Sequence, residues 1–367
     1  MRVLEFQLKK AVQPLTGAWK ELPVRRRGTT RLGISFRPLQ AAAFGLEVHS
    51  TLQALLAYPF QIIRLGAYWN RIEPDPGSFQ PQELDREVEA AERAGKQIIL
   101  SLGPLKTFGY PEFFVPGHHL KQPFPENRLV KASEYPALLQ AAMEFLARLV
   151  ERYKQHESII AWQLEHDAVA TLGVEHSWRL DAEFVAQEVA ALRKADATRP
   201  LIMNGYLPTT LLMRLWVWSK THDQGDSLAF AQHLADMVGI DYYPRHAFWP
   251  FGSRTLYWDG SQSPWLRTHI RKLLPRAGMS VKSLLITEGQ AEPWEAVTLP
   301  TNPLNQGLFS CLPEHLISNY NTCMGCFGEQ NPLYAYLFWG AEYWMLRKQS
   351  MDPSYLQAFE RVLENSG

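Results

Sequence analysis

The sequence of 367 residues predicts a single α/β domain in which strands and helices alternate eight times, the (β/α)8 or TIM-barrel architecture. Short apolar runs recur eight times along the chain, and segments with the helical period lie between many of them. Several runs are apolar almost throughout, which is typical of parallel strands buried on both faces. The length suits one barrel with long loops, and a hydrophobic content of 46% supports a large core.

The predicted elements follow one another in a regular order. Strands are expected at residues 31–37, 60–66, 96–102, 158–164, 199–204, 237–242, 283–288 and 333–339. Helices are expected at residues 50–58, 81–94, 134–153, 181–195, 225–236, 262–277 and 354–365. Gly95 directly follows the second helix and is a favourable helix-ending residue. Residues 1–30 are expected to form an N-terminal arm, and residues 31–367 the barrel domain.

Two predicted connections are unusually long for a compact domain. Residues 105–133 follow the third strand and are rich in Pro, Phe and His, and residues 295–332 follow the seventh strand. Loops of this length are usually functional or act as lids. His118 and His119 in the first of them are interpreted as solvated loop histidines, with contact to a substrate as the alternative. Glu73, Glu292 and Glu342 lie beyond strand ends and are interpreted as structural.

The composition excludes several classes of partner. The 37 Lys and Arg residues balance the 37 Asp and Glu residues, so bulk electrostatics do not favour a nucleic-acid or acidic-membrane partner. No apolar run reaches the length of a membrane span, and the N-terminus has no apolar core of signal-peptide length. A cytoplasmic location is therefore expected. The 12 Trp residues are mostly expected in the core, although such rings also suit the faces of sugars.

The three cysteines give no indication of chemistry. Cys323 and Cys326 have the C-x-x-C spacing, but the third cysteine, Cys311, is single, and no second pair stands at a zinc-site distance. A thioredoxin-like context for a redox motif is also missing. The cysteines are expected to be reduced structural thiols, and we predict no metal site.

Two predicted strands deliver carboxyl groups at their C-terminal ends, where barrels of parallel strands carry their chemistry. The seventh strand ends at Glu288, and the fourth strand leads into Glu165, His166 and Asp167. Two strand-end carboxyl groups that are far apart in sequence form a candidate pair for glycoside hydrolysis.

With these motifs the chain resembles the retaining glycoside hydrolases of clan A, a set of eightfold barrels that includes cellulases, mannanases and β-galactosidases. The resemblance covers residues 31 to 360 and includes features of the family 5, 35 and 42 branches. It is carried by the run from Arg64 to Pro74 with Gly77 and Phe79 after it, the run from Trp162 to Asp167, the pair Thr287-Glu288, and Phe338-Trp339-Gly340.

One motif departs from the clan pattern, which places Asn and then Glu at the end of the fourth strand. Here these two positions are His166 and Asp167. Glu165 does not replace the missing Glu, because a residue at this position lies one layer deeper, where it is expected to be a buried partner. Asp167 is shorter than Glu by one methylene. A charged His166 beside it would lower its pKa, which is unfavourable for a general acid.

The resemblance implies a role for each candidate residue. Glu288 is the implied nucleophile and Asp167 the implied acid/base. The remaining candidates are expected to bind substrate or to position these two. Arg64 is expected to orient Glu288, and Tyr242 to hydrogen-bond it. His166 is expected to donate a hydrogen bond to the sugar 2-hydroxyl or to Glu288, while Trp339 stacks on the sugar and Trp69 lies near the substrate.

The sequence thus predicts an O-glycosyl hydrolase that acts on a β-linked carbohydrate through a covalent glycosyl-enzyme and requires no cofactor. The alternative is a barrel that has lost efficient hydrolysis and serves as a carbohydrate-binding or scaffold protein. A metal site at His166 and Asp167 is a third possibility, but it lacks a second nearby His or Cys. The sugar, the linkage, endo or exo action and the oligomeric state stay open.

Overall fold

The computed structural model describes residues 7–10, 17–109, 113–125, 128–169, 178–221, 227–251, 254–261, 263, 268, 284–293, 310–327 and 333–367. Eight parallel strands close into a barrel in the order β12-β13-β2-β3-β4-β6-β8-β9. This confirms the predicted (β/α)8 architecture. That residues 31–367 form one domain stays a prediction.

Every predicted strand is present, and no boundary differs by more than two residues. The barrel strands are β2 (Arg31–Ser35), β3 (Ile62–Gly66), β4 (Gln97–Ser101), β6 (Ile159–Gln163), β8 (Leu201–Tyr206), β9 (Met237–Tyr242), β12 (Leu284–Gln290) and β13 (Ala335–Trp339). Nearly all of their residues are buried. A strand that is covered on both faces has an almost continuous apolar sequence, which explains why the sequence located these strands well.

Helices were predicted less completely. The described helices are α1 (Pro38–Ala43), α2 (Val48–Leu56), α3 (Trp69–Ile72), α4 (Gln82–Arg93), α5 (Pro136–Tyr153), α6 (Ala182–Ala195), α7 (Leu211–Thr221), α8 (Ser227–Leu234), α10 (Pro313–Phe327), α11 (Ala341–Gln349) and α12 (Ser354–Asn365). Residues 313–327 lie in the loop predicted at 295–332 but form α10. Burial of Leu316, Ile317 and Tyr320 outweighs the weak helix propensity of its Asn, Thr and Gly residues. The helix predicted at 262–277 lies outside the described residues except at positions 263 and 268.

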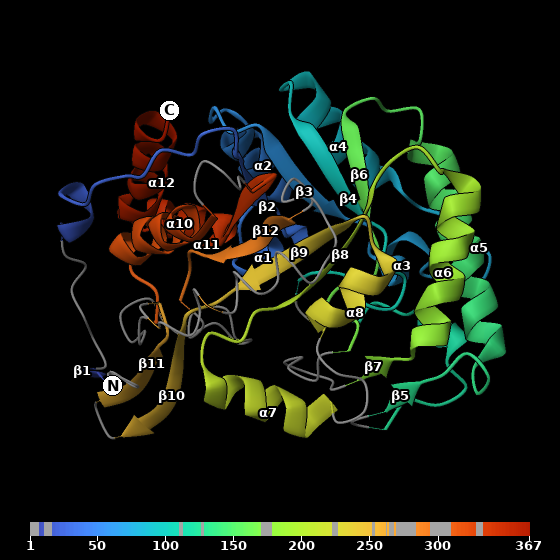
Figure 1. The fold of residues 1–367 in the computed structure, drawn as a ribbon. Helices are drawn as coiled ribbons and strands as arrows, with labels where there is room; N and C mark the ends of the chain where they lie inside the picture. The colour runs from blue at the N-terminus through green and yellow to red at the C-terminus, as the bar shows by residue number, and fades with distance from the viewer. Residues whose placement is uncertain are drawn as a thin grey trace. The chain divides into compact units, whose positions relative to one another are not determined.

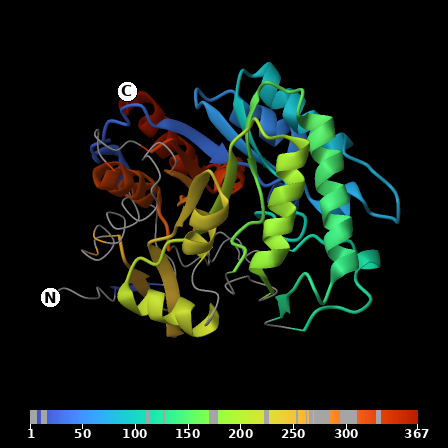
Figure 2. The same ribbon diagram turned by 45° about the vertical axis from the view of Figure 1, so that its right-hand side comes forward.

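The chain divides into two compact units. The second unit comprises Ile62–Tyr206 and Leu215–Ile240, and within it β3, β4, β6 and β8 pair in parallel. Figures 1 and 2 show α5 in green and α6 in yellow-green side by side. Pro136 at the first position of α5 has no N–H that needs a partner, and the buried leucines of α5 recur with the helical period.

The first unit comprises Met1–Gln61, Leu207–Arg214 and Asp241–Gly367. In it β13 pairs with both β12 and β2, and the red helices α10 and α11 pack on α12 (Figure 1). A small antiparallel sheet joins β1 (Gln7–Lys10), β11 (Arg254–Asp259) and β10 (Arg245–Phe251). Within the described residues, no helix combines the length and the apolar content needed to cross a lipid bilayer.

A β-bulge lies at the candidate nucleophile. Ile286 of β12 pairs with Tyr336 of β13, whereas Gly289 pairs with Phe338, so β12 contains one extra residue around Glu288. The Tyr336 ring occupies the space that a side chain at Gly289 would need. Bulges commonly redirect a side chain next to an active site.

We predict that Gly289→Ala lowers the free energy of unfolding by about 1–3 kcal/mol, because its methyl group would overlap the buried Tyr336 ring. Urea denaturation measures the change. Gly17→Ala is the control, since the nearest atom to a Cβ at Gly17 is an exposed Lys20 carbon at 4.0 Å. Equal stability of both variants and the wild type would contradict this packing.

Candidate active site

The Glu288 side chain is buried in the first unit and receives a short hydrogen bond. The Tyr243 hydroxyl donates to Glu288 Oε2 over 2.5 Å. Burial, and then the neighbouring Glu288 carboxylate, hold the pKa of Tyr243 well above its usual range, so the phenol stays protonated and remains a donor.

The prediction that Tyr242 hydrogen-bonds Glu288 is therefore wrong, and the Tyr243 hydroxyl makes this bond instead. Consecutive side chains at the end of a strand point to opposite faces, so only one of two adjacent tyrosines can reach a given carboxylate. Among the described residues, the buried Tyr242 hydroxyl has no hydrogen-bond partner.

Hydrogen bonds on both sides of Glu288 hold the segment that carries it. Thr287 Oγ1 donates to Asp241 Oδ1 over 2.7 Å, and Ser35 Oγ donates to the Thr287 carbonyl over 3.0 Å. After Glu288, the Gln290 amide accepts from the Arg245 N–H at 3.1 Å and donates to the Arg245 carbonyl at 2.8 Å. The strand extends two residues past the predicted end, and these contacts fix its direction.

A buried ion cluster lies beyond the ends of β2, β12 and β13. The Arg37 guanidinium donates to both Glu292 and Glu342 at 2.6–2.9 Å. Burial raises the pKa of Glu292, and Arg37 opposes this effect. The Arg37 guanidinium also lies 4.3 Å from the centre of the Trp339 ring. Stacking of Trp339 on a sugar stays a prediction.

The turn that carries Asp167 lies in the second unit and has an unusual backbone. Strand β6 ends at Gln163, and then Glu165 has φ 23° and Asp167 has φ 47°. Non-glycine residues rarely adopt such angles, and those that do are concentrated at functional sites. The His166 N–H donates to the Lys106 carbonyl over 2.8 Å, and Lys106 Nζ donates to the Asp167 carbonyl over 2.7 Å.

Glu165 is fully buried, as the sequence predicted. Its carboxylate accepts the N–H groups of Leu105 and Lys106 at 3.0 and 2.7 Å. Burial nevertheless raises the pKa of Glu165 to about 7, and it raises the pKa of the adjacent, fully buried Glu188 well above the usual range. Two buried carboxyl groups in contact retain a proton at neutral pH.

His166 is neutral in this environment. Its Nδ1 accepts from the Asn204 amide at 2.9 Å and faces Arg64 Nη2 at 3.3 Å. The Asn204 orientation is fixed, because its oxygen accepts from Gln163 Nε2 at 2.9 Å. Burial first, and then Arg64 and Lys106, hold the pKa of His166 well below its usual range. The imidazolium charge that the sequence allowed at His166 is therefore not present, and the ring carries its proton on Nε2.

Arg64 is fully buried among groups of the second unit. Its Nε donates to Gln163 Oε1 over 2.7 Å, and its guanidinium lies 3.9 Å from the centre of the Phe108 ring. Orientation of Glu288 by Arg64 stays a prediction.

Trp69 does not fit its predicted substrate-binding role. Its side chain has no exposed surface, its ring stacks on Phe145 at 5.2 Å, and its Nε1–H donates to Glu73 at 2.9 Å. The helical turn α3 directs this ring into the core, so it offers no face to a sugar.

Several positioning groups were not predicted, namely Tyr243, Asn204, Lys106, Gln163 and Glu188. Asn204 stands in the last predicted position of the fifth strand, and Gln163 lies within the motif from Trp162 to Asp167. The others act through contacts between segments that are distant in sequence.

We predict that Glu188→Gln makes stability less dependent on pH. The raised pKa values of Glu165 and Glu188 mean that the folded state retains protons that the unfolded state loses above pH 4.5, so wild-type stability falls as the pH rises toward about 7. An amide at position 188 removes the part of this loss that Glu188 causes, and it stabilises the protein at pH 7.5 by about 1–3 kcal/mol. Urea denaturation at pH 5 and pH 7.5 tests this, with exposed Glu183→Gln on the same helix as control. A stability difference from wild type that does not change with pH would contradict the paired carboxyl groups.

Comparison with known proteins agrees with this architecture. Residues 51–184 match the family model Glyco_hydro_42, described as beta-galactosidase. A comparison with curated proteins gave no match. Among solved structures, GH5_18 from Streptomyces cattleya in complex with GlcNAc has a TM-score of 0.55 at 12% identity, with coverage of 86% of this chain and 70% of that one.

Two xylanase structures are similar to the same degree. Xylanase 10B from Thermotoga maritima has a TM-score of 0.54 at 14% identity, with coverage of 94% and 98%. A GH10 endoxylanase retrieved from a sugarcane soil metagenome has a TM-score of 0.53 at 17% identity, with coverage of 92% and 100%. At these identities the likeness shows the fold. The family match and the eight-stranded barrel together support the predicted resemblance to the clan A glycoside hydrolases and a glycoside hydrolase activity.

Proposed function

We propose that this protein is a retaining β-glycosidase with Glu288 as nucleophile and Asp167 as acid/base. The observation that carries the proposal is the buried Glu288 carboxylate with the Tyr243 hydroxyl donating to it at 2.5 Å. A hydrogen bond to the charged form favours an ionised carboxylate, which a nucleophile requires.

The reaction proceeds in two displacements. A Glu288 oxygen attacks the anomeric carbon while the glycosidic C–O bond breaks, and Asp167 gives its proton to the leaving oxygen. The product is a glycosyl ester on Glu288. Asp167, now a carboxylate, takes a proton from the water that attacks the anomeric carbon, and the ester bond breaks. Two inversions release the sugar with its original configuration.

His166 fits the position of the clan Asn in this scheme. With Nδ1 occupied by the Asn204 donor, the neutral ring carries its proton on Nε2 and offers one N–H donor. This N–H is proposed to bond the sugar 2-hydroxyl or the nucleophile. A neutral imidazole also leaves Asp167 able to hold a proton, as a general acid must.

The proposed substrate class is a β-linked oligo- or polysaccharide. One related structure, a variant of the GH5_18 protein from Streptomyces cattleya, is a complex with Manb1-4GlcNAc, and two others are named as xylanases. These names support a carbohydrate ligand for the barrel. The shorter Asp167 and the His166 substitution favour one alternative, a barrel that binds carbohydrate without efficient turnover.

We predict that wild-type protein hydrolyses activated aryl β-glycosides and that Glu288→Gln reduces the rate to background. Asp167→Asn should lose ~10²–10⁴-fold on substrates with poor leaving groups but much less on activated ones, because activated leaving groups need little protonation. Rates across a leaving-group series, with proton NMR of the first anomer released, test both roles and the retention of configuration.

Glu183→Gln, a substitution at an exposed position, is the control for effects of mutation and purification on the folded protein. Turnover that persists in Glu288→Gln would remove that residue from the mechanism. An α-anomer released first would exclude retention. Glycan binding without turnover across the series would establish the alternative instead.

A second prediction concerns the donor to the nucleophile. Tyr243→Phe should lower kcat/KM by ~10- to 10²-fold, because a hydrogen bond to a charged group contributes about 1.5–3 kcal/mol. Tyr242→Phe is the matched control, since its hydroxyl has no partner among the described residues. Equal loss in both variants would show that ring packing, and not the Tyr243 hydroxyl, supports catalysis.

A further inference from the structure

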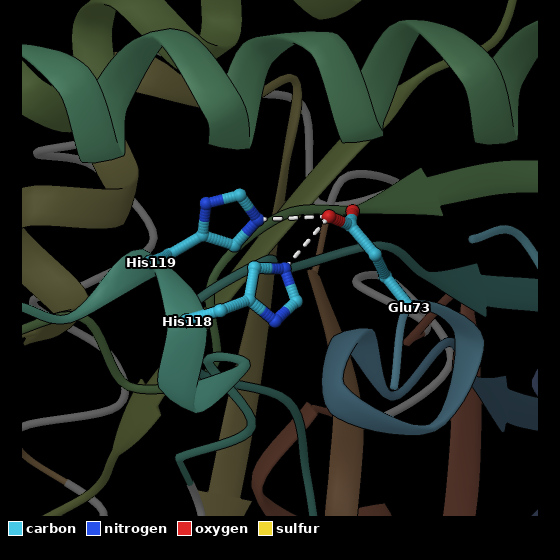
Figure 3. Close-up of side chains that lie close together, drawn as sticks. All are labelled: Glu73, His118 and His119. Carbon is cyan, nitrogen blue, oxygen red and sulfur yellow. Dashed lines mark hydrogen bonds and ion pairs between the residues drawn. The ribbon is translucent and has the colours of Figure 1, made fainter. Parts of the chain in front are cut away.

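A compact cluster of three potential metal ligands lies in the second unit, on segments the proposed mechanism does not use (Figure 3). Glu73 directly follows α3, and His118 and His119 belong to the short helix η2 (Gly117–His119). His118 Nε2 lies 3.1 Å and His119 Nε2 2.9 Å from the same oxygen, Glu73 Oε1. The three ligand atoms lie within 4.8 Å of one another.

Convergence of two adjacent histidines on one atom needs a specific backbone. Consecutive side chains in a strand point to opposite faces, and in an α-helix they do not face one another. The tight turn after Pro116 brings the two ring centres to 4.3 Å, and Figure 3 shows both rings directed at the Glu73 carboxylate. A simple ion pair would require only one of these rings.

We propose that Glu73, His118 and His119 bind a divalent transition-metal ion of the zinc type. In a tetrahedral zinc site with bonds of about 2.0–2.1 Å, neighbouring ligand atoms lie about 3.3 Å apart. The observed distances of 2.9 and 3.1 Å differ from this by a few tenths of an ångström. Each ring would carry its proton on Nδ1 and present the Nε2 lone pair to the ion.

The carboxylate is already oriented for this role. Its second oxygen, Oε2, accepts the Trp69 Nε1–H at 2.9 Å, which leaves Oε1 directed at the imidazoles. Trp69 is fully buried and its ring lies 4.7 Å from that of His119. Partners that orient metal ligands in this way raise metal affinity, and their loss typically costs ~10–100-fold.

The cluster is open to solvent, and its ligand types favour transition metals over calcium and magnesium. The His118 and His119 side chains are 20% and 21% exposed and Glu73 is 10% exposed, so an ion can enter from solvent and a water can fill the fourth position. Two imidazoles and one carboxylate suit zinc and its transition-metal neighbours, whereas calcium and magnesium prefer oxygen ligands.

Such an ion would tie together two loops that follow neighbouring barrel strands. Glu73 lies after β3, and the histidines lie in the connection after β4. These two loops already contact each other, because the Asn70 N–H donates to the Phe114 carbonyl at 2.7 Å. The neighbouring Phe113 forms a β-bridge with Lys106. Lys106 in turn donates to the Asp167 carbonyl and so holds that turn. The proposed ion would thus cross-link the loops that follow β3 and β4. This structural role does not depend on the proposed hydrolysis.

Equilibrium dialysis against Zn²⁺ and absorption spectroscopy with Co²⁺ test the site on the full chain. We expect Co²⁺ bound to the wild type to give tetrahedral d–d bands without a thiolate charge-transfer band. His118→Ala and His119→Ala should each weaken binding by at least ~10²-fold. His156→Ala is the matched control, because that imidazole pairs with the single carboxylate of Glu92 at 2.9 Å. It should bind like the wild type.

Three outcomes would overturn the proposal. They are no metal uptake by the wild type, equal uptake by wild type and both histidine variants, and a thiolate band that assigns the ion to Cys323 and Cys326. The two histidines are partly exposed, so their replacement should leave the fold intact, as far-UV circular dichroism verifies. Because the readout is metal binding, failure of the proposed hydrolysis would leave this test unaffected.

Discussion

The backbone of the turn after β6 is the constraint on which the proposed acid/base depends. Glu165 and Asp167 both have positive φ, and such a conformation costs about 1–3 kcal/mol at each non-glycine residue. The loop after β4 offsets this cost, because Lys106 accepts the His166 N–H through its carbonyl and donates to the Asp167 carbonyl through its ammonium group. Gly103 permits the contact, since a Cβ there would lie 2.8 Å from the Glu165 nitrogen.

Desolvation then decides the charge of each group near this turn. Glu165 and Glu188 are buried together and retain a proton, whereas buried Arg64 donates to the neutral amide of Gln163. His166 is neutral because donors face its Nδ1 and because burial disfavours the imidazolium. In the proposed mechanism, His166 would therefore supply a neutral N–H donor where the clan pattern has asparagine.

The Glu288 side of the proposed site is ordered by different contacts. Strand β12 is held at Thr287 by Asp241 and Ser35, and past Glu288 its Gln290 carbonyl accepts from Asn319 of α10. Helix α10 therefore supports the strand that carries the proposed nucleophile. Its sequence resembles a loop, since tertiary burial and not local propensity stabilises it.

The sequence by itself determined the barrel, its eight strands and the two carboxyl-bearing segments, because strands buried on both faces have a continuous apolar sequence. It did not determine which of Tyr242 and Tyr243 faces Glu288, the charge of His166, the burial of Trp69, or the convergence of His118 and His119 on Glu73. These depend on strand pleat, on desolvation and on contacts between segments far apart in the chain. Such contacts form only when the tertiary structure does, so no local pattern of residues contains them.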